Sequence, residues 1–171
     1  MRKVKLGIIG VGNMGSGHLK NIMEGKCPEI EVAAVADINP DRLRWAREQL
    51  GEALPVFSTA EEMLDSGLIE AAIVAVPHYD HPKYAIECFK RNIHVMVEKP
   101  AGVYTKQVRE MNEAAAKSNV KFGLMFNQRT DHIYRKMREL VQGGSLGQIR
   151  RTSWIITNWY RPQAYYDSGA W

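Results

Sequence analysis

Residues 7–18 read GIIGVGNMGSGH, and they place Gly10, Gly12 and Gly15 in the spacing GxGxxG. The spacing alone is weakly informative, since the chain holds 14 glycines. Its context is more specific, because an apolar run ends at the first glycine and a helical apolar pattern begins after the third. In such a unit the first glycine makes a tight turn, the second lets the backbone approach a pyrophosphate, and the third lets helix and strand pack closely. The stretch therefore predicts a dinucleotide-binding turn, with the phosphates at a helix N-terminus.

An acidic residue at the end of the next apolar run supports this interpretation. Asp37 follows the turn by about 20 residues, where the fingerprint places a carboxylate for the ribose hydroxyls. A carboxylate there repels a 2′-phosphate and favours NAD over NADP, although Arg42 and Arg44 lie nearby in sequence and are able to assist such a phosphate. Three alternatives stay open: a loop acid before the helix start at Asn39–Pro40, a glycine turn without a ligand, and an S-adenosylmethionine site.

Apolar runs alternate with helical patterns over most of the chain. The runs lack strict alternation of apolar and polar residues, which is expected of parallel strands covered on both faces. Helix start signals separate them, such as Asn39 before Pro40. This order predicts an α/β fold, a Rossmann-type doubly wound parallel sheet. The predicted strands cover residues 3–10, 30–37, 55–57, 69–76, 93–97 and 121–126.

Composition narrows the class of protein. Apolar residues make up 45% and charged residues 25% of the 171, as in ordinary soluble domains. The net charge of +4 comes from scattered basic residues, so nucleic-acid binding is not indicated. Cys27 and Cys88 belong to no metal-binding spacing, and we expect two reduced thiols in a cytoplasmic protein without a metal site. We expect neither a membrane span nor a signal peptide.

The pattern changes after residue 126. We predict that residues 1–126 form an NAD(P)-binding domain and that residues 127–171 are the incomplete start of an α+β domain. Residues 130–142 have the periodicity of an amphipathic helix. Residues 148–160 read as one long strand of β-branched and aromatic residues. A strand needs partners at its edges, so we expect this second domain to be cut short.

Polar residues follow three of the predicted strands, in AVPHYDHP (75–82), VEKPAG (97–102) and MFNQR (125–129). Open parallel sheets bind ligands outside the carboxyl ends of their strands. A lysine there, Lys99, is able to donate to an alcohol or carbonyl oxygen and to stabilise a developing alkoxide. We expect Glu98 to orient Lys99 or contact the cofactor, and we consider a cis bond before Pro100. The alternative is that this pair is a solvated strand end.

Six stretches of the chain resemble the Gfo/Idh/MocA oxidoreductases, the glucose–fructose oxidoreductase and inositol dehydrogenase family. They are GIIGVGNMG, Asp37, AVPHYDH, HVMVEKPAG, MFNQR and GSLGQI, and the resemblance extends over essentially the whole chain. The resemblance implies an N-terminal Rossmann domain for NAD(P) and a C-terminal domain that forms the substrate site and usually the oligomer interface. Members oxidise or reduce a hydroxyl carbon of a sugar, inositol or related polyol. It also implies that Lys99 contacts substrate and cofactor, while an acid/base histidine comes from the C-terminal domain.

These considerations give a set of predicted site residues. Lys99 is the predicted catalytic residue. For Asn127 and Arg129 a helix cap and an exposed charge are equally good interpretations, and histidines such as His78 and His81 more often cap helices or lie at the surface. Trp171 resembles the tryptophan of a Trp-Arg pair that approaches the nicotinamide. The predicted cofactor contacts are Gly10, Gly12, Asn13, Met14, Gly15, Asp37, Val76, Pro77, His81, Glu98, Lys99, Asn127, Arg129 and Trp171.

No residue of 127–171 fits the acid/base role, and members of the family run to about twice this length. We therefore expect the chain to be the N-terminal portion of an NAD-dependent, cytoplasmic, homo-oligomeric dehydrogenase or reductase that acts on a small sugar or polyol. We expect neither a nucleic-acid nor a membrane partner. The alternative from a different class is a non-catalytic module that binds or senses a dinucleotide.

Overall fold

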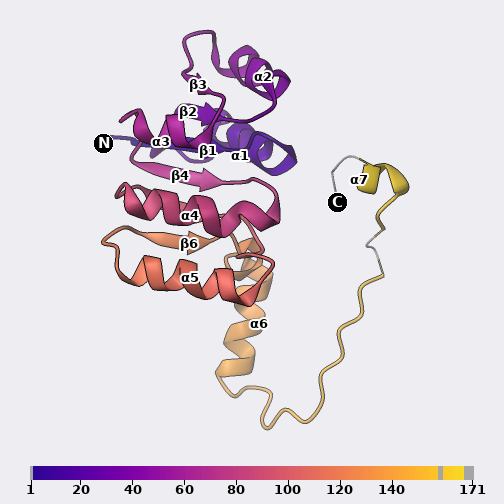
Figure 1. The fold of residues 1–171 in the computed structure, drawn as a ribbon. Coiled ribbons are helices and arrows are strands. Elements are labelled where there is room, and N and C mark those ends of the chain that lie inside the picture. The colour runs from indigo at the N-terminus through magenta and orange to yellow at the C-terminus, as the bar shows by residue number, and fades with distance from the viewer. Residues whose placement is uncertain (1, 158–159, 168–171) are drawn as a thin grey trace. The chain divides into compact units, whose positions relative to one another are not determined.

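A computed structural model of the chain describes residues 2–157 and 160–167. The chain divides into two compact units, Met1–Asn127 and Gln128–Trp171. The first unit contains the sheet that positions the candidate site (Figure 1). Among the described residues, no helix combines the length and the apolarity that crossing a membrane requires.

All six strands of the first unit run parallel, in the order β3-β2-β1-β4-β5-β6. The order reverses between β1 and β4, so the chain leaves these two neighbouring strands in opposite directions. Open α/β sheets bind their ligands in the crevice outside such a switch point. The predicted Rossmann-type sheet is confirmed. The strands are β1 Val4–Ile9, β2 Ile30–Ala36, β3 Val56–Phe57, β4 Ala71–Val74, β5 His94–Val97 and β6 Phe122–Leu124.

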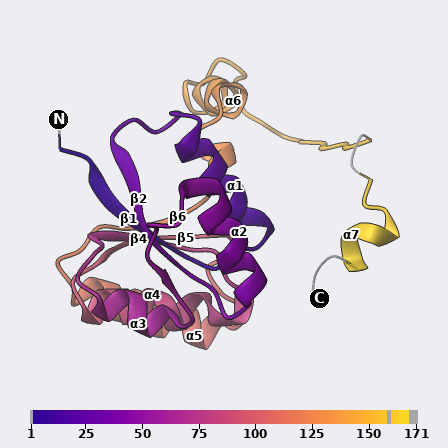
Figure 2. The ribbon, with the colours of Figure 1, turned by 90° about the horizontal axis from the view of Figure 1, so that it is seen from above.

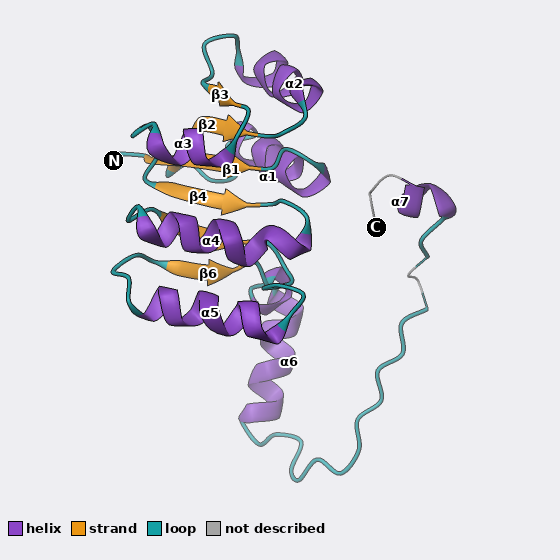
Figure 3. Ribbon diagram, viewed as in Figure 1, coloured by secondary structure: helices purple, strands orange, loops and turns teal. Residues whose placement is uncertain are grey.

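Helices pack on both faces of this sheet (Figures 2 and 3). On one face, Leu19 of α1 and Ala46 of α2 join a buried cluster with β1 and β2. On the other face, Met63 of α3, Phe89 of α4 and Met111 of α5 form a larger buried cluster with β4 and β5. The sheet is therefore the middle of three layers. The helices of this unit are α1 Asn13–Met23, α2 Pro40–Leu50, α3 Ala60–Asp65, α4 His81–Lys90 and α5 Thr105–Ala116.

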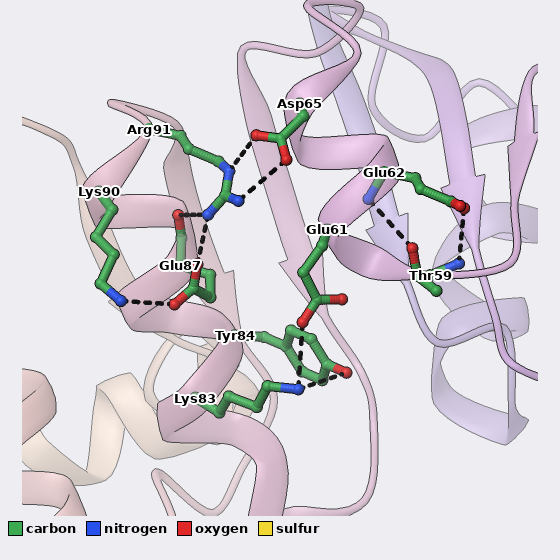
Figure 4. A network of polar contacts seen from close by, with 9 residues as sticks. All are labelled: Thr59, Glu61, Glu62, Asp65, Lys83, Tyr84, Glu87, Lys90 and Arg91. Atoms are coloured by element: carbon green, nitrogen blue, oxygen red, sulfur yellow. Dashed lines mark hydrogen bonds and ion pairs between the residues drawn. The ribbon is translucent and has the colours of Figure 1, made fainter.

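Local signals place the helix starts. The side chain of Asn39 accepts a hydrogen bond from the Asp41 N–H at 2.9 Å, and Pro40 is the first residue of α2, as predicted. At α3, the Thr59 hydroxyl and the Glu62 carboxylate each accept from the other residue's backbone N–H, which forms a capping box (Figure 4). These contacts satisfy backbone donors that the first turn of a helix leaves without partners.

A polar network joins α3 to α4 on the outside of the larger cluster (Figure 4). Arg91, which follows α4, donates to both carboxylate oxygens of Asp65 at 2.6 and 3.1 Å, and to Glu87 at 2.5 Å. Lys90 also donates to Glu87, at 2.7 Å. The hydrogen bond from Arg91 lowers the pKa of the Asp65 carboxyl, and Lys90 and then Arg91 lower that of Glu87.

One strand departs from the expectation of burial on both faces. In β5, Val95 and Val97 are buried, whereas His94 and Met96 are exposed, the latter by 39%. The α1 side of β4, β5 and β6 carries an apolar cavity of about 500 Å³, whose lining includes Ile73 and Met96. The buried cluster that α1 and α2 form on this face includes residues of β1, β2 and β4 and none of β5 or β6. The sequence lacks strict alternation of apolar and polar residues, and this correctly predicted a parallel sheet. The accompanying expectation that every strand is buried on both faces is wrong for β5.

The second unit contains the predicted amphipathic helix, α6, which spans His132–Gln142, and a short helix, α7, at Gln163–Asp167. The Asp131 carboxylate caps α6 by accepting from the Ile133 N–H at 2.9 Å. Residues 148–157 and 160 form no strand, so the prediction of a long strand there is wrong for the described residues. The side chains favour a strand, but pairing needs a neighbour with open backbone groups. The described part of this unit supplies none.

Candidate dinucleotide and substrate crevice

The glycine turn between β1 and α1 has the geometry that its spacing predicts. Gly10 has φ +88°, which favours glycine. A Cβ on Gly15 would lie 1.9 Å from the Gly10 carbonyl oxygen, so the third glycine is required for packing. A Cβ on Gly12 would meet no protein atom within 4 Å. The turn thus offers open space beside the N-terminus of an 11-residue helix, where backbone N–H groups attract anions.

The carboxylate of Asp37 is fixed against this turn. Its Oδ2 accepts from the Val11 N–H at 2.7 Å, and its Oδ1 accepts from the Asn39 N–H at 2.8 Å. Asp37 directly follows β2, and its half-buried side chain joins the end of β2 to the glycine turn. Asp37 therefore contacts the glycine turn as well as the backbone before α2. Its position beside the turn is the position from which a carboxylate reaches ribose hydroxyls in dinucleotide-binding folds.

At the end of β5, Glu98 is buried and Lys99 is exposed. Glu98 is 4% exposed, and its N–H donates to the Val74 carbonyl at 2.9 Å, which continues the pairing with β4. Its Oε1 lies 2.6 Å from Nε2 of His18 on α1, and its Oε2 accepts from the Lys99 N–H at 3.2 Å. The Lys99–Pro100 bond is cis. Both carboxylate oxygens of Glu98 therefore have partners within the chain, and its contact with a cofactor stays a prediction.

His81, at the start of α4, is 1% exposed, so the expectation of a surface residue is wrong. Its Nδ1 lies 2.6 Å from the Pro100 carbonyl oxygen, and its Nε2 lies 2.9 Å from that of Val76. A neutral imidazole has one N–H, so the ring donates to both carbonyls only in its doubly protonated form. Because both ring nitrogens face the backbone, this geometry does not support the predicted direct cofactor contact by His81. It supports a role in holding the segments after β4 and β5 together.

The segment after β4 brings a further histidine to the same place. The ring centroid of His78 lies 5.6 Å from that of His81. Burial lowers the pKa of His78, and the positive charges of His81 and Lys99 lower it further, against an opposing effect of Glu98. Pro77, which directly precedes His78, is exposed. Two histidines and the exposed Lys99 therefore gather at the crevice end of β4 and β5, together with the buried Glu98.

The remaining predicted contacts come from the start of α1 and from the segment after β6. Asn13 and Met14 are exposed in the first turn of α1, beside the glycine turn. Asn127 and Arg129 are exposed in a 3₁₀ turn, Asn127–Arg129, at which the two units meet in sequence. Trp171 lies outside the described residues. Among the described residues, no three His, Cys, Asp or Glu side chains are grouped to hold a metal ion.

His18 is the site residue that the sequence prediction missed. It lies three positions after Gly15 on α1, and residues at this separation share a face of a helix. Because Gly15 packs against β1, a side chain at position 18 also points toward the sheet. That periodicity is the signal that identifies it, and the sequence gives no indication that its partner is a residue 80 positions away.

Comparison with known proteins identifies the family. A model for the oxidoreductase family with an NAD-binding Rossmann fold, GFO_IDH_MocA, matches residues 4–126. The chain belongs to this family. The resemblance found in the sequence is thereby confirmed.

Curated relatives include the myo-inositol 2-dehydrogenase of Thermotoga maritima, 29% identical over 85% of this chain and 42% of the relative. The rhizopine catabolism protein MocA of Rhizobium meliloti is 27% identical over 87% of this chain and 45% of its own. The chain spans about half the length of these relatives.

Solved structures of dehydrogenases are similar to this chain in fold. Scyllo-inositol dehydrogenase from Lactobacillus casei, solved with NAD(H) and scyllo-inositol, is 30% identical with a TM-score of 0.80, covering 85% of this chain and 43% of that one. The WlbA dehydrogenase from Chromobacterium violaceum, solved with NADH and UDP-GlcNAcA, is 26% identical with a TM-score of 0.86, covering 100% of this chain and 48% of that one.

Proposed function

We propose that this chain provides the NAD-binding half of an oxidoreductase acting on a hydroxyl carbon of a sugar, inositol or related polyol. The observation that carries the proposal is the meeting of the glycine turn, the Asp37 carboxylate and the Lys99 turn around one switch point of the sheet. Relatives solved with NAD(H) and an inositol, or with NADH and a nucleotide sugar, support the same cofactor and substrate class.

The residues fit a dinucleotide. The open space beside Gly12 is a cradle that a Cβ would fill, and the α1 N-terminus faces it with backbone donors. We infer that Asp37 accepts hydrogen bonds from ribose hydroxyls and repels a 2′-phosphate, which favours NAD over NADP. Arg44 is ion-paired with Asp41 at 3.0 Å, so part of its charge is already compensated. The bound cofactor accepts or supplies the hydride.

Lys99 has the role that the resemblance implies. Its ammonium donates to the reacting oxygen of the substrate and stabilises negative charge that develops there. Pro77 and Asn127 lie in segments that flank the same end of the sheet, and we retain them, with Val76 and Arg129, as proposed contacts. We propose that the proton is moved by the acid/base histidine that the resemblance implies for the C-terminal domain, since no residue of 127–171 fits this role.

The first test is a titration of the 171-residue chain with NADH and, separately, NADPH. Four tryptophans and the reduced nicotinamide provide the fluorescence signal. Saturable binding that is tighter for NADH supports the proposal. Tighter binding of NADPH would overturn the role of Asp37 but would still support a dinucleotide site at the glycine turn. If neither nucleotide binds, the proposal of a dinucleotide site in this chain is overturned.

The catalytic part of the proposal needs the longest form of the chain that its gene encodes, assayed with inositols and related polyols. Lys99→Met should lower turnover by about 100-fold or more, the range of a lost electrostatic stabiliser, and change the dissociation constant of NADH by less than about 3-fold. Dinucleotide binding without turnover of any polyol would favour the sensing module instead. Unchanged turnover in Lys99→Met would remove this lysine from the mechanism.

We also propose a second domain, a homo-oligomeric assembly and a cytoplasmic location for the full-length protein. Residues from 127 onward begin the domain that completes the substrate site and the contacts of a homo-oligomer, which light scattering of the full-length protein tests. The cytoplasmic location that we propose agrees with Cys27 and Cys88 being free thiols. Fractionation of the source cells tests this location.

A further inference from the structure

Lys99 lies between two residues that are each held by a histidine from a different helix. Before it, Glu98 contacts His18 of α1 at 2.6 Å. After it, the Pro100 carbonyl contacts His81 of α4 at 2.6 Å. We propose that His18 and His81 are positioning residues that fix the backbone on both sides of Lys99, so that its ammonium reaches one place in the crevice. The functional part of this inference rests on the proposed oxidoreductase activity, and the structural part does not.

Burial makes the His18 contact structurally demanding. The Glu98 side chain is 5% exposed and that of His18 is 18% exposed, so water compensates little of the carboxylate charge. A buried carboxylate without partners is strongly unfavourable, and charge-assisted hydrogen bonds are the strong ones. The second oxygen of Glu98 accepts from the Lys99 N–H at 3.2 Å. His18 therefore fixes the orientation of the carboxylate, and the carboxylate holds the Lys99 backbone.

His81 performs the corresponding task on the other side. It lies at the start of α4 and bridges the carbonyls of Val76 and Pro100, which follow β4 and β5. Burial of the ring excludes water as a substitute donor for these carbonyls. The bridge keeps the segment that carries His78 at a fixed distance from the Lys99 turn. Lys99 itself is exposed, so its precision comes from these neighbours and not from packing of its own side chain.

The His18 contact also links two functions of the site. α1 begins at the glycine turn that we propose for the pyrophosphate, and the same helix carries His18 one turn further on. The contact therefore joins the helix of the proposed phosphate site to the strand end that carries Lys99.

The test uses hydrogen exchange of the Lys99 amide in the 171-residue chain and in two variants of His18. His18→Leu removes the donor, whereas His18→Gln retains an N–H donor at a similar reach. We expect the amide of Lys99 to exchange about 10- to 100-fold faster in His18→Leu, the range of a lost charge-assisted hydrogen bond, and close to the parent rate in His18→Gln. His132→Leu, an exposed histidine of α6, is the matched control and should leave this amide unchanged.

Exchange at the amides of Val35 and Val74 distinguishes global unfolding from a local change at Lys99. Both residues are buried in strands, and their amides should keep their protection in both variants. If His18→Leu fails to fold, Glu98→Gln replaces it, because the loss of the carboxylate charge weakens the same contact and should speed exchange at Lys99. Unchanged exchange at Lys99 in a folded His18→Leu or Glu98→Gln chain would overturn the positioning role. So would equal acceleration in His18→Leu and His18→Gln.

The functional arm uses the full-length protein. His18→Leu should lower kcat with little change in the dissociation constant of NADH, and should have no further effect on kcat in a Lys99→Met background, because it acts through Lys99. Additive effects of the two substitutions would overturn action through Lys99. Faster exchange at Lys99 in a protein without any polyol turnover would refute the proposed function and leave the positioning contact standing.

Discussion

The glycine turn allows a prediction in which three neighbouring glycines respond differently to the same added methyl group. A Cβ at Gly15 would lie 1.9 Å from the Gly10 carbonyl oxygen, whereas a Cβ at Gly12 or Gly17 would meet nothing within 4 Å. Real Cβ atoms essentially never approach closer than 3.0 Å, so Gly15→Ala must move α1 and the Gly10 carbonyl apart by about 1.1 Å. The obstructing atom belongs to the backbone and has no rotamer to escape into.

The expected magnitudes follow from these distances. Gly15→Ala should lower the free energy of unfolding by about 3 kcal/mol, the upper end for overpacking. Gly17→Ala, inside α1, should raise it by about 0.5–1 kcal/mol, because alanine loses less entropy than glycine in a helix. Gly12→Ala should lower it by no more than about 1 kcal/mol, since alanine is the poorer N-cap. If a pyrophosphate contacts the turn at this position, the methyl group of Gly12→Ala should weaken NADH binding about 10- to 100-fold.

The assay is urea unfolding followed by tryptophan fluorescence, together with the NADH titration on each variant that remains folded. Gly17→Ala serves as the matched control, because it adds the same atom to the same helix and should bind NADH like the parent. Two results would refute the reasoning. NADH binding by Gly12→Ala at parental affinity would mean that no ligand approaches this backbone. Parental stability of Gly15→Ala would mean that the close approach of Gly15 and Gly10 is not required by the fold.

Two further predictions concern the larger buried cluster and its outer edge. Arg91→Met should destabilise the chain at pH 7, and its difference in stability from the parent should shrink as the pH falls below about 4.5. Asp65 and Glu87 have lowered pKa values in the folded chain, so the stability they contribute is present above their unfolded pKa values and is lost when they are protonated. Melting temperatures of both chains from pH 7 to 3 measure this, and a difference that does not depend on pH would contradict it. Burial raises the pKa of the Cys88 thiol to about 12, so iodoacetamide at pH 8 should modify Cys27 alone until the chain is unfolded, and mass spectrometry showing rapid modification of Cys88 in the folded chain would contradict its burial.

The parts of the fold that sequence alone predicted correctly are those determined within short stretches. The apolar runs lie where strands form, and Asn39 before Pro40 begins a helix as its capping chemistry requires. The three glycines of the turn are close in sequence, so their spacing already contains the geometry of the strand–turn–helix unit. The turn at Glu98, Lys99 and Pro100 was recognisable for a similar reason, because its charged residues end an apolar run abruptly.

The parts that sequence alone missed depend on contacts between distant residues. The strand expected at 148–160 has suitable side chains, yet a strand forms only where a neighbour presents open backbone groups, and the described part of the second unit presents none. The partial exposure of β5 is of the same kind, because coverage of one face depends on which helix reaches it. The strand propensity of a residue can be read from the sequence, whereas strand pairing and the burial of a sheet face depend on which other segment lies beside it.

The site shows how these two kinds of information combine. The motif around Lys99 identifies where a cationic group stands, but the contacts that fix it come from His18, 80 positions before Glu98, and from His81, 19 positions before Pro100. An exposed lysine on an unsupported turn would sample many positions, and proximity contributes to a reaction only when the reacting groups are held in place. A short motif with this chemistry therefore needs partners elsewhere in the chain, and buried histidines facing the motif are the feature by which such partners are recognised in a structure.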